Sequence, residues 1–239
     1  MTEDLEAETA AARWMYPWRL RDGRVLPTLH SRVDAVNKAR AEAIEVPIRR
    51  ALEFGGSALD FACNEGWYSQ RLLDWGASRV LAFDVRAMNV RRARILRDHF
   101  GISEEQLAFR QADVFSLNAT ELGTFDVVLC LGLIYHVEHP MGVLRLARAC
   151  TRGLCVIESQ VTRQTDPLPH HGGTGFSSLP ASLGLLKESA NSTLASTPSV
   201  LSFVPNKAAL VMMAEHAGFD DIEVLEPIED RVLLLARTS

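Results

Sequence analysis

Short apolar runs alternate with helical patterns along most of this chain, and this alternation restricts its fold more than any other feature. Five runs read as buried strands: "SALDFAC" (57–63), "RVLAFDV" (79–85), "LAFRQAD" (107–113), "FDVVLCLG" (125–132) and "LCVIESQ" (154–160). Helical patterns over 65–75, 86–99 and 141–150 lie between them. Strands joined through helices form parallel sheets covered on both faces, so we predict an α/β fold with a doubly wound, mostly parallel sheet.

Two further runs near the C-terminus, "IEVLEP" (222–227) and "RVLLLAR" (231–237), are separated only by "IED". This short connection predicts an antiparallel hairpin at one edge, which brings the sheet to seven strands. A helix over Lys207–Ala217 leads into the hairpin, because Asn206 can cap its start and Gly218 can end it.

The length favours a single domain over residues 1–239. Two segments of this domain do not follow the alternation of strands and helices. Residues 1–55 carry helix-like patterns and predict an N-terminal helical cap, in which Trp14, Tyr16 and Trp18 surround a polar turn at Asp22–Gly23. Residues 161–205 are rich in Gly, Pro, Ser and Thr and are long for a simple connection. We interpret them as a substrate lid, with a merely mobile excursion as the alternative.

The net charge and the cysteine pattern limit which partners, compartment and cysteine chemistry this chain can have. Lys plus Arg total 25 against 30 Asp plus Glu, and the formal net charge of −5 disfavours nucleic acid and anionic membranes as partners. No stretch approaches the roughly 20 apolar residues of a spanning helix, and the acidic N-terminus lacks a signal-like apolar run, so we expect a cytoplasmic protein. The four cysteines show no C-x-x-C pair, which favours reduced thiols over disulfides or zinc. A homodimer is left open.

Acidic residues lie at the ends of the first two predicted strands, where parallel sheets bind their ligands. Asp60 ends the first strand, and Ala62 and Gly66 permit a tight turn after it. Asp84 ends the second strand, where a carboxylate can accept hydrogen bonds from ribose hydroxyls. Glu65 would repel a pyrophosphate at the helix start, which argues against a dinucleotide. The pattern therefore predicts a nucleoside site without a pyrophosphate.

These residues carry a family resemblance. The stretch "LDFACNEGWYSQRLLDWGASRVLAFD" resembles motifs I and II of the class I S-adenosylmethionine-dependent methyltransferases, whose usual form is L-D-x-G-x-G-x-G followed by an acid after the second strand. "QADVFSL" and "FDVVLCLGLIYHVEHP" resemble the family's third-strand and fourth-strand segments, so the likeness covers about residues 55–160 and the terminal hairpin. It implies a Rossmann-like fold with S-adenosylmethionine as cofactor.

Within the family, four segments are most similar to the branch that contains wobble-uridine tRNA-modifying alkyltransferases and related sugar-hydroxyl methyltransferases: "CNEGWYS", "LIYH", "VPNKAAL" and "YPWRLRDGRVLP". The chain departs from the family pattern at Ala62 and Asn64, which stand where glycines are usual. Asparagine tolerates left-handed backbone better than most residues, so we expect the turn to keep its shape.

The resemblance also implies the cofactor-binding residues. Asp60 and the backbone from Ala62 through Cys63 and Asn64 to Gly66 would hold the methionine part. Asp84 with Val85 would bind the ribose, Asp113 with Val114 would meet the adenine, and Leu131 would bring a backbone carbonyl near the amino group. The alternatives are a plain helix cap for Asp84 and a turn residue for Asp113.

Methyl transfer to oxygen needs the two reactants aligned and the hydroxyl proton removed. His136 is the first candidate for this base, because histidine titrates near neutral pH, and His139 is the second. His136 could instead only form a wall of the cofactor pocket. Glu158, which ends the fifth strand, could bind a sugar hydroxyl, orient a histidine, help to ligate a divalent ion such as Mg²⁺, or be an edge carboxylate without a partner.

Candidate substrate contacts come from three segments. Tyr16 and Trp18 could stack on sugar or base rings, with His30 beside them, and Tyr135 and His170 could line the same space. Packing of the N-terminal aromatic residues is the alternative. The arginines of 86–97 point several ways around their helix, and we expect a solvated face: Arg86, Arg91, Arg92, Arg94 and Arg97.

Three functions remain open. The first is methylation of a hydroxyl on a small metabolite, with a sugar or glycoside to be tried first. The second is modification of the tRNA wobble uridine, which the branch resemblance favours and the negative charge disfavours. The third is a non-catalytic protein that binds the nucleoside.

Overall fold

The computed structural model describes residues 3–11, 13–29, 31–163, 181–187, 201–228 and 230–238. The helices are α1 (Glu3–Ala11), α2 (Ser31–Ala51), α3 (Trp67–Asp74), α4 (Ala87–His99), α5 (Ala119–Leu122), α6 (Pro140–Cys150) and α7 (Lys207–Ala217), with short 3-10 helices η1 (Val114–Ser116) and η2 (Ile134–His136). The strands are β1 (Ser57–Phe61), β2 (Arg79–Asp84), β3 (Leu107–Gln111), β4 (Phe125–Leu131), β5 (Thr151–Gln160), β6 (Leu183–Lys187), β7 (Leu201–Pro205), β8 (Asp221–Ile228) and β9 (Arg231–Arg237).

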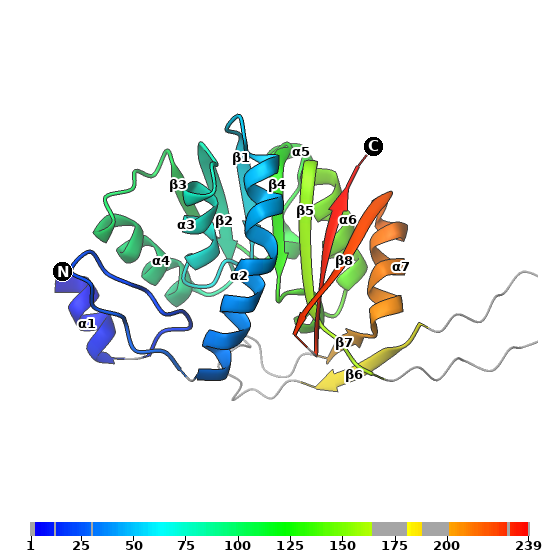
Figure 1. The fold of residues 1–239 in the computed structure, drawn as a ribbon, viewed down its shortest axis with the longest axis horizontal. Helices are drawn as coiled ribbons and strands as arrows, with labels where there is room; N and C mark the ends of the chain where they lie inside the picture. Colours follow the sequence, from blue (N-terminus) through cyan, green and yellow to red (C-terminus); the bar gives the residue numbers. More distant parts are fainter. Residues whose placement is uncertain are drawn as a thin grey trace, which may run out of the picture.

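The main sheet has seven strands in the order β3-β2-β1-β4-β5-β9-β8 (Figure 1). Strands β1 to β5 are parallel, and β9 runs antiparallel to both β5 and β8. The predicted mostly parallel sheet with an antiparallel C-terminal hairpin is therefore confirmed. The strand order reverses between β1 and β4, and a sheet of this kind opens its ligand crevice at such a reversal, beyond the carboxyl ends of the strands.

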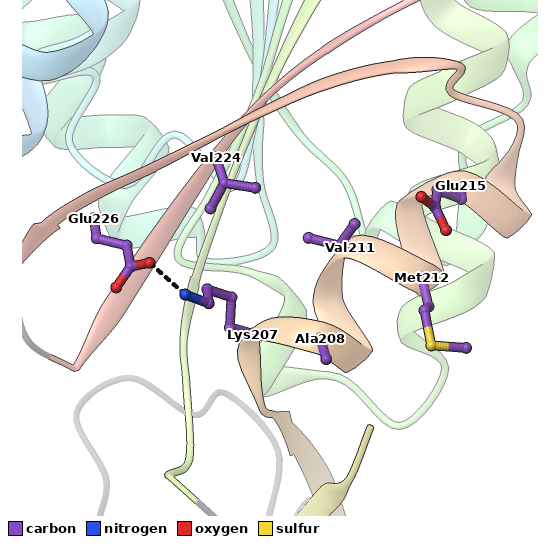
Figure 2. Close-up of a pocket in the computed structure, with 7 residues that line it drawn as sticks. All are labelled: Lys207, Ala208, Val211, Met212, Glu215, Val224 and Glu226. Carbon is purple, nitrogen blue, oxygen red and sulfur yellow. Dashed lines mark hydrogen bonds and ion pairs between the residues drawn. The ribbon is translucent and has the colours of Figure 1, made fainter. Parts of the chain in front are cut away.

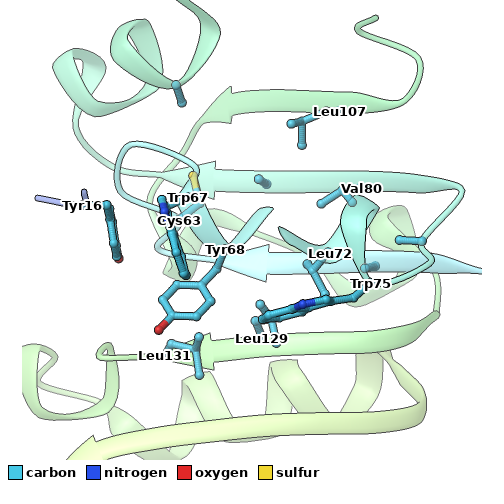
Figure 3. Close-up of a cluster of buried hydrophobic side chains, with 14 of the residues drawn as sticks. Tyr16, Cys63, Trp67, Tyr68, Leu72, Trp75, Val80, Leu107, Leu129 and Leu131 are labelled. Carbon is cyan, nitrogen blue, oxygen red and sulfur yellow. The ribbon is translucent and has the colours of Figure 1, made fainter. Parts of the chain in front are cut away.

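Helices cover both faces of the sheet, as the predicted crossovers require. One hydrophobic core joins the sheet to α2, α3 and α4, and Figure 3 shows part of it, with Leu72 and Trp75 over the strands. The other core joins the sheet to α6 and α7. Strand β1 is buried along its whole length, with Ala58 in the first core and Leu59 in the second.

The predicted N-terminal cap is helical only in part. Helices α1 and α2 form, but residues 13–29 turn back on themselves through bridges between Trp14 and Thr28 and between Arg19 and Val25. Pro17 and Pro27 disfavour helix at the residues before them. The turn predicted at Asp22–Gly23 is present, since Gly23 is left-handed with φ of 85°.

The segment predicted as a lid contains two strands that the sequence analysis did not predict. Strands β6 and β7 pair antiparallel in a separate two-stranded sheet, which contacts η2 near the lower edge in Figure 1. Residues 164–180 and 188–200, with the candidate His170, lie outside the described residues, as does His30. A lid role for 161–205 stays a prediction.

The helix before the hairpin begins and ends as predicted. The Asn206 side chain accepts a hydrogen bond from the backbone N–H of Ala209 at 2.8 Å, and Gly218 ends α7 in left-handed backbone. In the described parts of the chain, no helix combines the length and the apolar character that crossing a membrane requires.

Candidate active site

The turn between β1 and α3 is built from three left-handed residues. Ala62, Asn64 and Gly66 have φ angles of 57°, 51° and 81°, so the strand predicted over 57–63 already ends at Phe61. A Cβ at Gly66 would lie 2.5 Å from Cζ of Phe109 on β3. The glycine is therefore required for close packing of this turn against β3 as well as for its backbone angle.

Asp84, at the end of β2, fastens this turn to the neighbouring strand. Its Oδ2 accepts from the backbone N–H of Asn64 at 2.8 Å, and its Oδ1 accepts from the N–H of Arg86 and the side chain of Asn89. Burial raises the pKa of Asp84, although these hydrogen bonds oppose the rise. The N-cap of α4 is Arg86 and no side chain caps the helix, so Asp84 is not the plain helix cap of the alternative. Its carboxylate holds the N–H of the residue before the helix and lies at the edge where the ribose is expected.

Asp60, at the end of β1, is buried beneath the same turn. Its side chain is 2% exposed and its Oδ2 accepts from the hydroxyl of Ser69 at 2.6 Å. Burial raises the pKa of Asp60 to about 7; the Ser69 hydrogen bond opposes this rise and the negative charge of Asp84 adds to it. Two carboxylates that influence one another therefore lie at one edge of the sheet.

Asp60→Asn is expected to flatten part of the pH dependence of stability. The unfolded chain loses the Asp60 proton near its ordinary pKa of 3.8 and the folded chain near 7, so the free energy of unfolding falls as pH rises between these values. From pH 5 to pH 8 the wild type should lose up to about 3 kcal/mol more than the variant. Urea unfolding at both pH values measures this difference, and equal losses would contradict the burial of an ionisable Asp60.

The end of β3 lies beside the end of β2, since Asp84 is in register with Gln111. Asp113 is exposed and its Oδ1 accepts from the N–H of Phe115 at 3.0 Å, as the turn-residue alternative expects. Apolar side chains remain open to solvent along this edge: Val85 (43%), Met88 (57%) and Phe115 (48%). An apolar surface beside these acids suits the planar base of a nucleoside. Val114 is half-buried in η1.

The ends of β4 and β5 carry the candidate catalytic residues. Leu131 is in register with Glu158, and η2 follows with Tyr135 and His136, whose ring centroids are 4.1 Å apart. His136 is half-buried, whereas His139 is exposed before α6, with its ring edge-on to that of Phe115 at 5.9 Å. The structure therefore brings Tyr135, His136 and Glu158 to neighbouring strand ends.

Glu158 is the centre of a buried charged cluster. Its Oε1 forms an ion pair with Nη2 of Arg40 at 3.0 Å and accepts a hydrogen bond from Arg231 at 2.9 Å. Arg231 also donates to the Tyr135 hydroxyl at 3.0 Å. The side chains of Glu158, Arg40 and Arg231 are 1%, 9% and 18% exposed. Oε2 of Glu158 and Nε of Arg40 have no hydrogen-bond partner within the described structure. Two cations against one anion leave this buried cluster with one excess positive charge.

Neither arginine of this cluster was predicted from the sequence. Arg40 lies on the buried stripe of α2 with Asn37, Ile44 and Ile48, and a charged residue at helical spacing among buried positions was the available signal. Arg231 opens the last strand, and its approach to Glu158 depends on how the hairpin pairs with β5.

The two described aromatic candidates of the N-terminal segment lie in different places in the structure. Tyr16 lies parallel to Trp67, the first residue of α3, with centroids 5.6 Å apart, so it reaches the carboxyl edge of the sheet (Figure 3). Trp18 is buried against Phe100, which follows the last residue of α4. Because Asp84 precedes that helix and α4 is about 20 Å long, the structure does not bring Trp18 to this edge and favours the packing alternative.

Two sequence expectations about charge need correction. Arg92 is buried, not solvated, and it donates to Glu65 at 3.0 Å. Glu65 is 3% exposed, and its other oxygen accepts from the backbone N–H of Met15 at 2.9 Å. The Glu65 charge is matched by an arginine within the protein, so repulsion by Glu65 is no longer a reason to exclude a pyrophosphate.

Other parts of the described structure add no candidate chemistry. Among the described residues, no group of three or more His, Cys, Asp or Glu side chains lies close enough together to hold a metal ion. A hollow between α7 and β8 is lined by Val211, Met212 and Val224 and crossed by the ion pair of Lys207 and Glu226 at 2.6 Å (Figure 2). It contains none of the predicted site residues.

Comparison with known proteins gives one family match and two curated relatives. A family model described as "Methyltransferase domain" matches residues 36–224. A tRNA U34 carboxymethyltransferase of Helicobacter pylori (strain G27) is 26% identical over 172 residues, which are 71% of this chain and 58% of that protein. A ubiquinone biosynthesis O-methyltransferase of Xanthomonas oryzae pv. oryzae is 32% identical over 135 residues, 56% of this chain and 50% of that protein. The chain thus spans 58% and 50% of the length of these two curated relatives.

Among solved structures, the chain is similar to the N-terminal domain of EvdMO1 in the presence of SAH and D-fucose, with a TM-score of 0.69 and 22% identity. That match covers 100% of this chain and 98% of the other. A DhpI–SAH complex is similar with a TM-score of 0.59 at 16% identity, over 86% of this chain and 85% of the other. At these identities the likeness supports the fold.

Proposed function

Because the chain belongs to the family of methyltransferase domains, whose model spans residues 36–224, we propose that it is an S-adenosylmethionine-dependent methyltransferase. The acceptor we propose is a hydroxyl of a small metabolite, with a sugar or glycoside first. The observation that carries the proposal is the left-handed turn of Ala62, Asn64 and Gly66, held between the buried carboxylates of Asp60 and Asp84.

The residues at this edge fit the cofactor. Asp60 and the turn from Ala62 through Cys63 to Gly66 would hold the methionine part, and Asp84 would bind the ribose hydroxyls. The apolar side chains of Val85, Met88 and Phe115, exposed beside Asp113, would cover the adenine. S-adenosylmethionine, when bound, supplies a methyl carbon activated by its sulfonium.

Side chains of this protein would remove the proton of the acceptor hydroxyl and orient the acceptor. His136, half-buried beside Tyr135, would accept the proton of the acceptor hydroxyl, and His139 is the second candidate for this base. The unpartnered Oε2 of Glu158 could accept a hydrogen bond from a hydroxyl of the acceptor. Tyr16 would form part of the opposite wall. Together these side chains would contact more than one hydroxyl of the acceptor. A site of this kind suits a sugar.

The likeness to a domain solved with SAH and D-fucose also supports a sugar acceptor. The net charge of −5 supports it further, since nucleic-acid binding depends on an excess of basic residues at the interface. Nothing in this proposal requires a metal ion.

A second candidate function is modification of the tRNA wobble uridine, and one observation favours it. Curated relatives are tRNA U34 carboxymethyltransferases, and the cluster of Arg40, Arg231 and Glu158 has an excess positive charge that suits a carboxylate on the transferred group. The surface of this chain would then need a local basic patch or a partner to hold the tRNA.

Isotope-labelled donors separate these functions. The protein is incubated with methyl-labelled S-adenosylmethionine and either a panel of sugars and glycosides that includes D-fucose or unmodified tRNA. In parallel, tRNA is offered the analogue of this donor that carries a labelled carboxymethyl group on its sulfonium, and all products are identified by mass spectrometry. Label in a sugar methyl ether is the expected result. A modified wobble uridine with either donor would support the second candidate, and failure to bind either sulfonium donor would contradict both.

A further inference from the structure

The turn that would carry the cofactor is strained at two residues. Ala62 and Asn64 are the non-glycine residues with positive φ in the described parts of the chain. Left-handed backbone is unfavourable for residues with a Cβ and persists only where surrounding contacts hold it. This chain therefore needs a clamp on the turn that a sequence with glycines at both positions would not need.

One part of the clamp comes from the N-terminal segment 13–29. Glu65, which lies between Asn64 and Gly66, has a buried carboxylate that contacts this segment. Oε2 accepts from the backbone N–H of Met15 at 2.9 Å, and Oε1 accepts from Arg92 at 3.0 Å. The next residue, Tyr16, stacks on Trp67, which begins α3 directly after the turn. The segment thus contacts the turn on both sides of Gly66.

Arg92 links this clamp to the rest of the N-terminus. Its Nε donates to Glu8 of α1 at 3.0 Å, its Nη1 donates to the carbonyl of Arg13 at 3.3 Å, and its guanidinium lies 5.0 Å from the ring centroid of Trp14. The Arg92 side chain is 7% exposed. A single buried cation therefore joins α1, the segment 13–29 and the turn.

We propose that Glu65 and Arg92 are positioning residues that hold the strained turn in its cofactor-binding shape through the docked segment 13–29, so that docking of this segment and cofactor binding stabilise one another. The proposal rests on the proposed function. It assigns the N-terminal segment a part in cofactor affinity, and it accounts for the presence of Ala62 and Asn64 where glycines are usual.

Coupling of this kind is reciprocal. S-adenosylhomocysteine should slow amide hydrogen exchange in residues 13–29, and loss of the buried ion pair should weaken binding of the same compound. We expect Glu65→Gln together with Arg92→Met to weaken it by about 10-fold or more. The KM for S-adenosylmethionine should rise by a similar factor. The value of kcat should fall by a smaller factor, because the proposed base His136 is untouched whereas Tyr16 of the acceptor wall lies on the loosened segment.

The double variant removes both charges of the Glu65–Arg92 pair, and Glu8 keeps its ion pair with Arg91, so none of these charges is left without a partner. Its matched control is Arg91→Met, because Arg91 is on the same helix and pairs with the same Glu8 at 2.6 Å but is 61% exposed. The control should bind S-adenosylhomocysteine within about 2-fold of wild type, as expected for an exposed pair. Calorimetry gives the affinities, and thermal melts show that each variant is folded. If the double variant does not fold, Glu65→Gln alone is compared with the control.

Ala62→Gly with Asn64→Gly should relieve the backbone strain of the turn, and the turn should then no longer need the clamp. When Glu65→Gln and Arg92→Met are added to this double-glycine variant, the affinity for S-adenosylhomocysteine should again fall. The fold-decrease should be less than one third of the fold-decrease that the same two substitutions cause in the wild type. Equal affinity of the clamp variant and the Arg91 control, or an undiminished loss in the glycine background, would overturn the proposal. Failure of the wild type to bind would instead contradict the proposed function.

Discussion

Asp84→Asn should weaken binding of S-adenosylhomocysteine by about 100-fold or more, measured by calorimetry. The buried carboxylate holds the turn through the N–H of Asn64 and would also accept hydrogen bonds from the ribose hydroxyls. An amide has one acceptor oxygen in place of two and no charge, and hydrogen bonds to charged acceptors contribute about 1.5–3 kcal/mol each. The loss of two of them exceeds the roughly 2.8 kcal/mol that 100-fold represents.

Asp126→Asn is the matched control for this change. Asp126 also accepts a hydrogen bond from a backbone N–H, that of Ser57 at 2.8 Å, and pairs with Arg152, but it lies at the amino end of β1 and β4. Its variant should bind S-adenosylhomocysteine as the wild type does. If both variants bind alike, Asp84 does not hold the ribose.

Glu158→Gln should lower Tm by about 10 °C, because it leaves Arg40 and Arg231 buried without a counter-charge. Removal of one partner from a buried ion pair costs about 3–5 kcal/mol, and a domain of this size loses about 2–4 °C for each kcal/mol. Transfer activity should fall as well, since Arg231 also holds the Tyr135 hydroxyl beside His136. Differential scanning calorimetry measures the shift in Tm.

Two variants test the cause of that shift. Glu223→Gln removes an exposed carboxylate that lies 3.9 Å from Arg237 in the same sheet, and it should change Tm by no more than about 2 °C. Arg40→Met combined with Glu158→Gln should recover part of the loss, because one buried cation is removed with the anion. A Tm for the double variant below that of Glu158→Gln alone would contradict the charge argument.

Much of the fold could be predicted from the sequence because its signals are local. The strands are short apolar runs, and Asn206 and Gly218 mark both ends of α7 within a few residues. The positions of Asp60 and Asp84 followed from the rule that parallel strands end at one edge of the sheet. The two strands β6 and β7 were missed because they lie in a segment rich in turn-forming residues.

The charged contacts of the site were harder to predict because each joins segments far apart in the chain. Glu158 meets Arg40 from α2 and Arg231 from β9, and Glu65 meets Arg92 from α4. No spacing rule links such positions, and charged residues are assigned to the surface by default. A charged residue on a buried helical stripe, as at Arg40, is the one local signal that could have indicated such a contact.

A crystal structure of the protein with S-adenosylhomocysteine tests the central claim most directly. The account predicts the nucleoside at the ends of β1 and β2, with the ribose hydroxyls on Asp84, the amino-acid part on the turn from Ala62 to Gly66, and the sulfur facing His136. A compound bound elsewhere, or a turn whose left-handed residues relax away from Asp84 on binding, would contradict it.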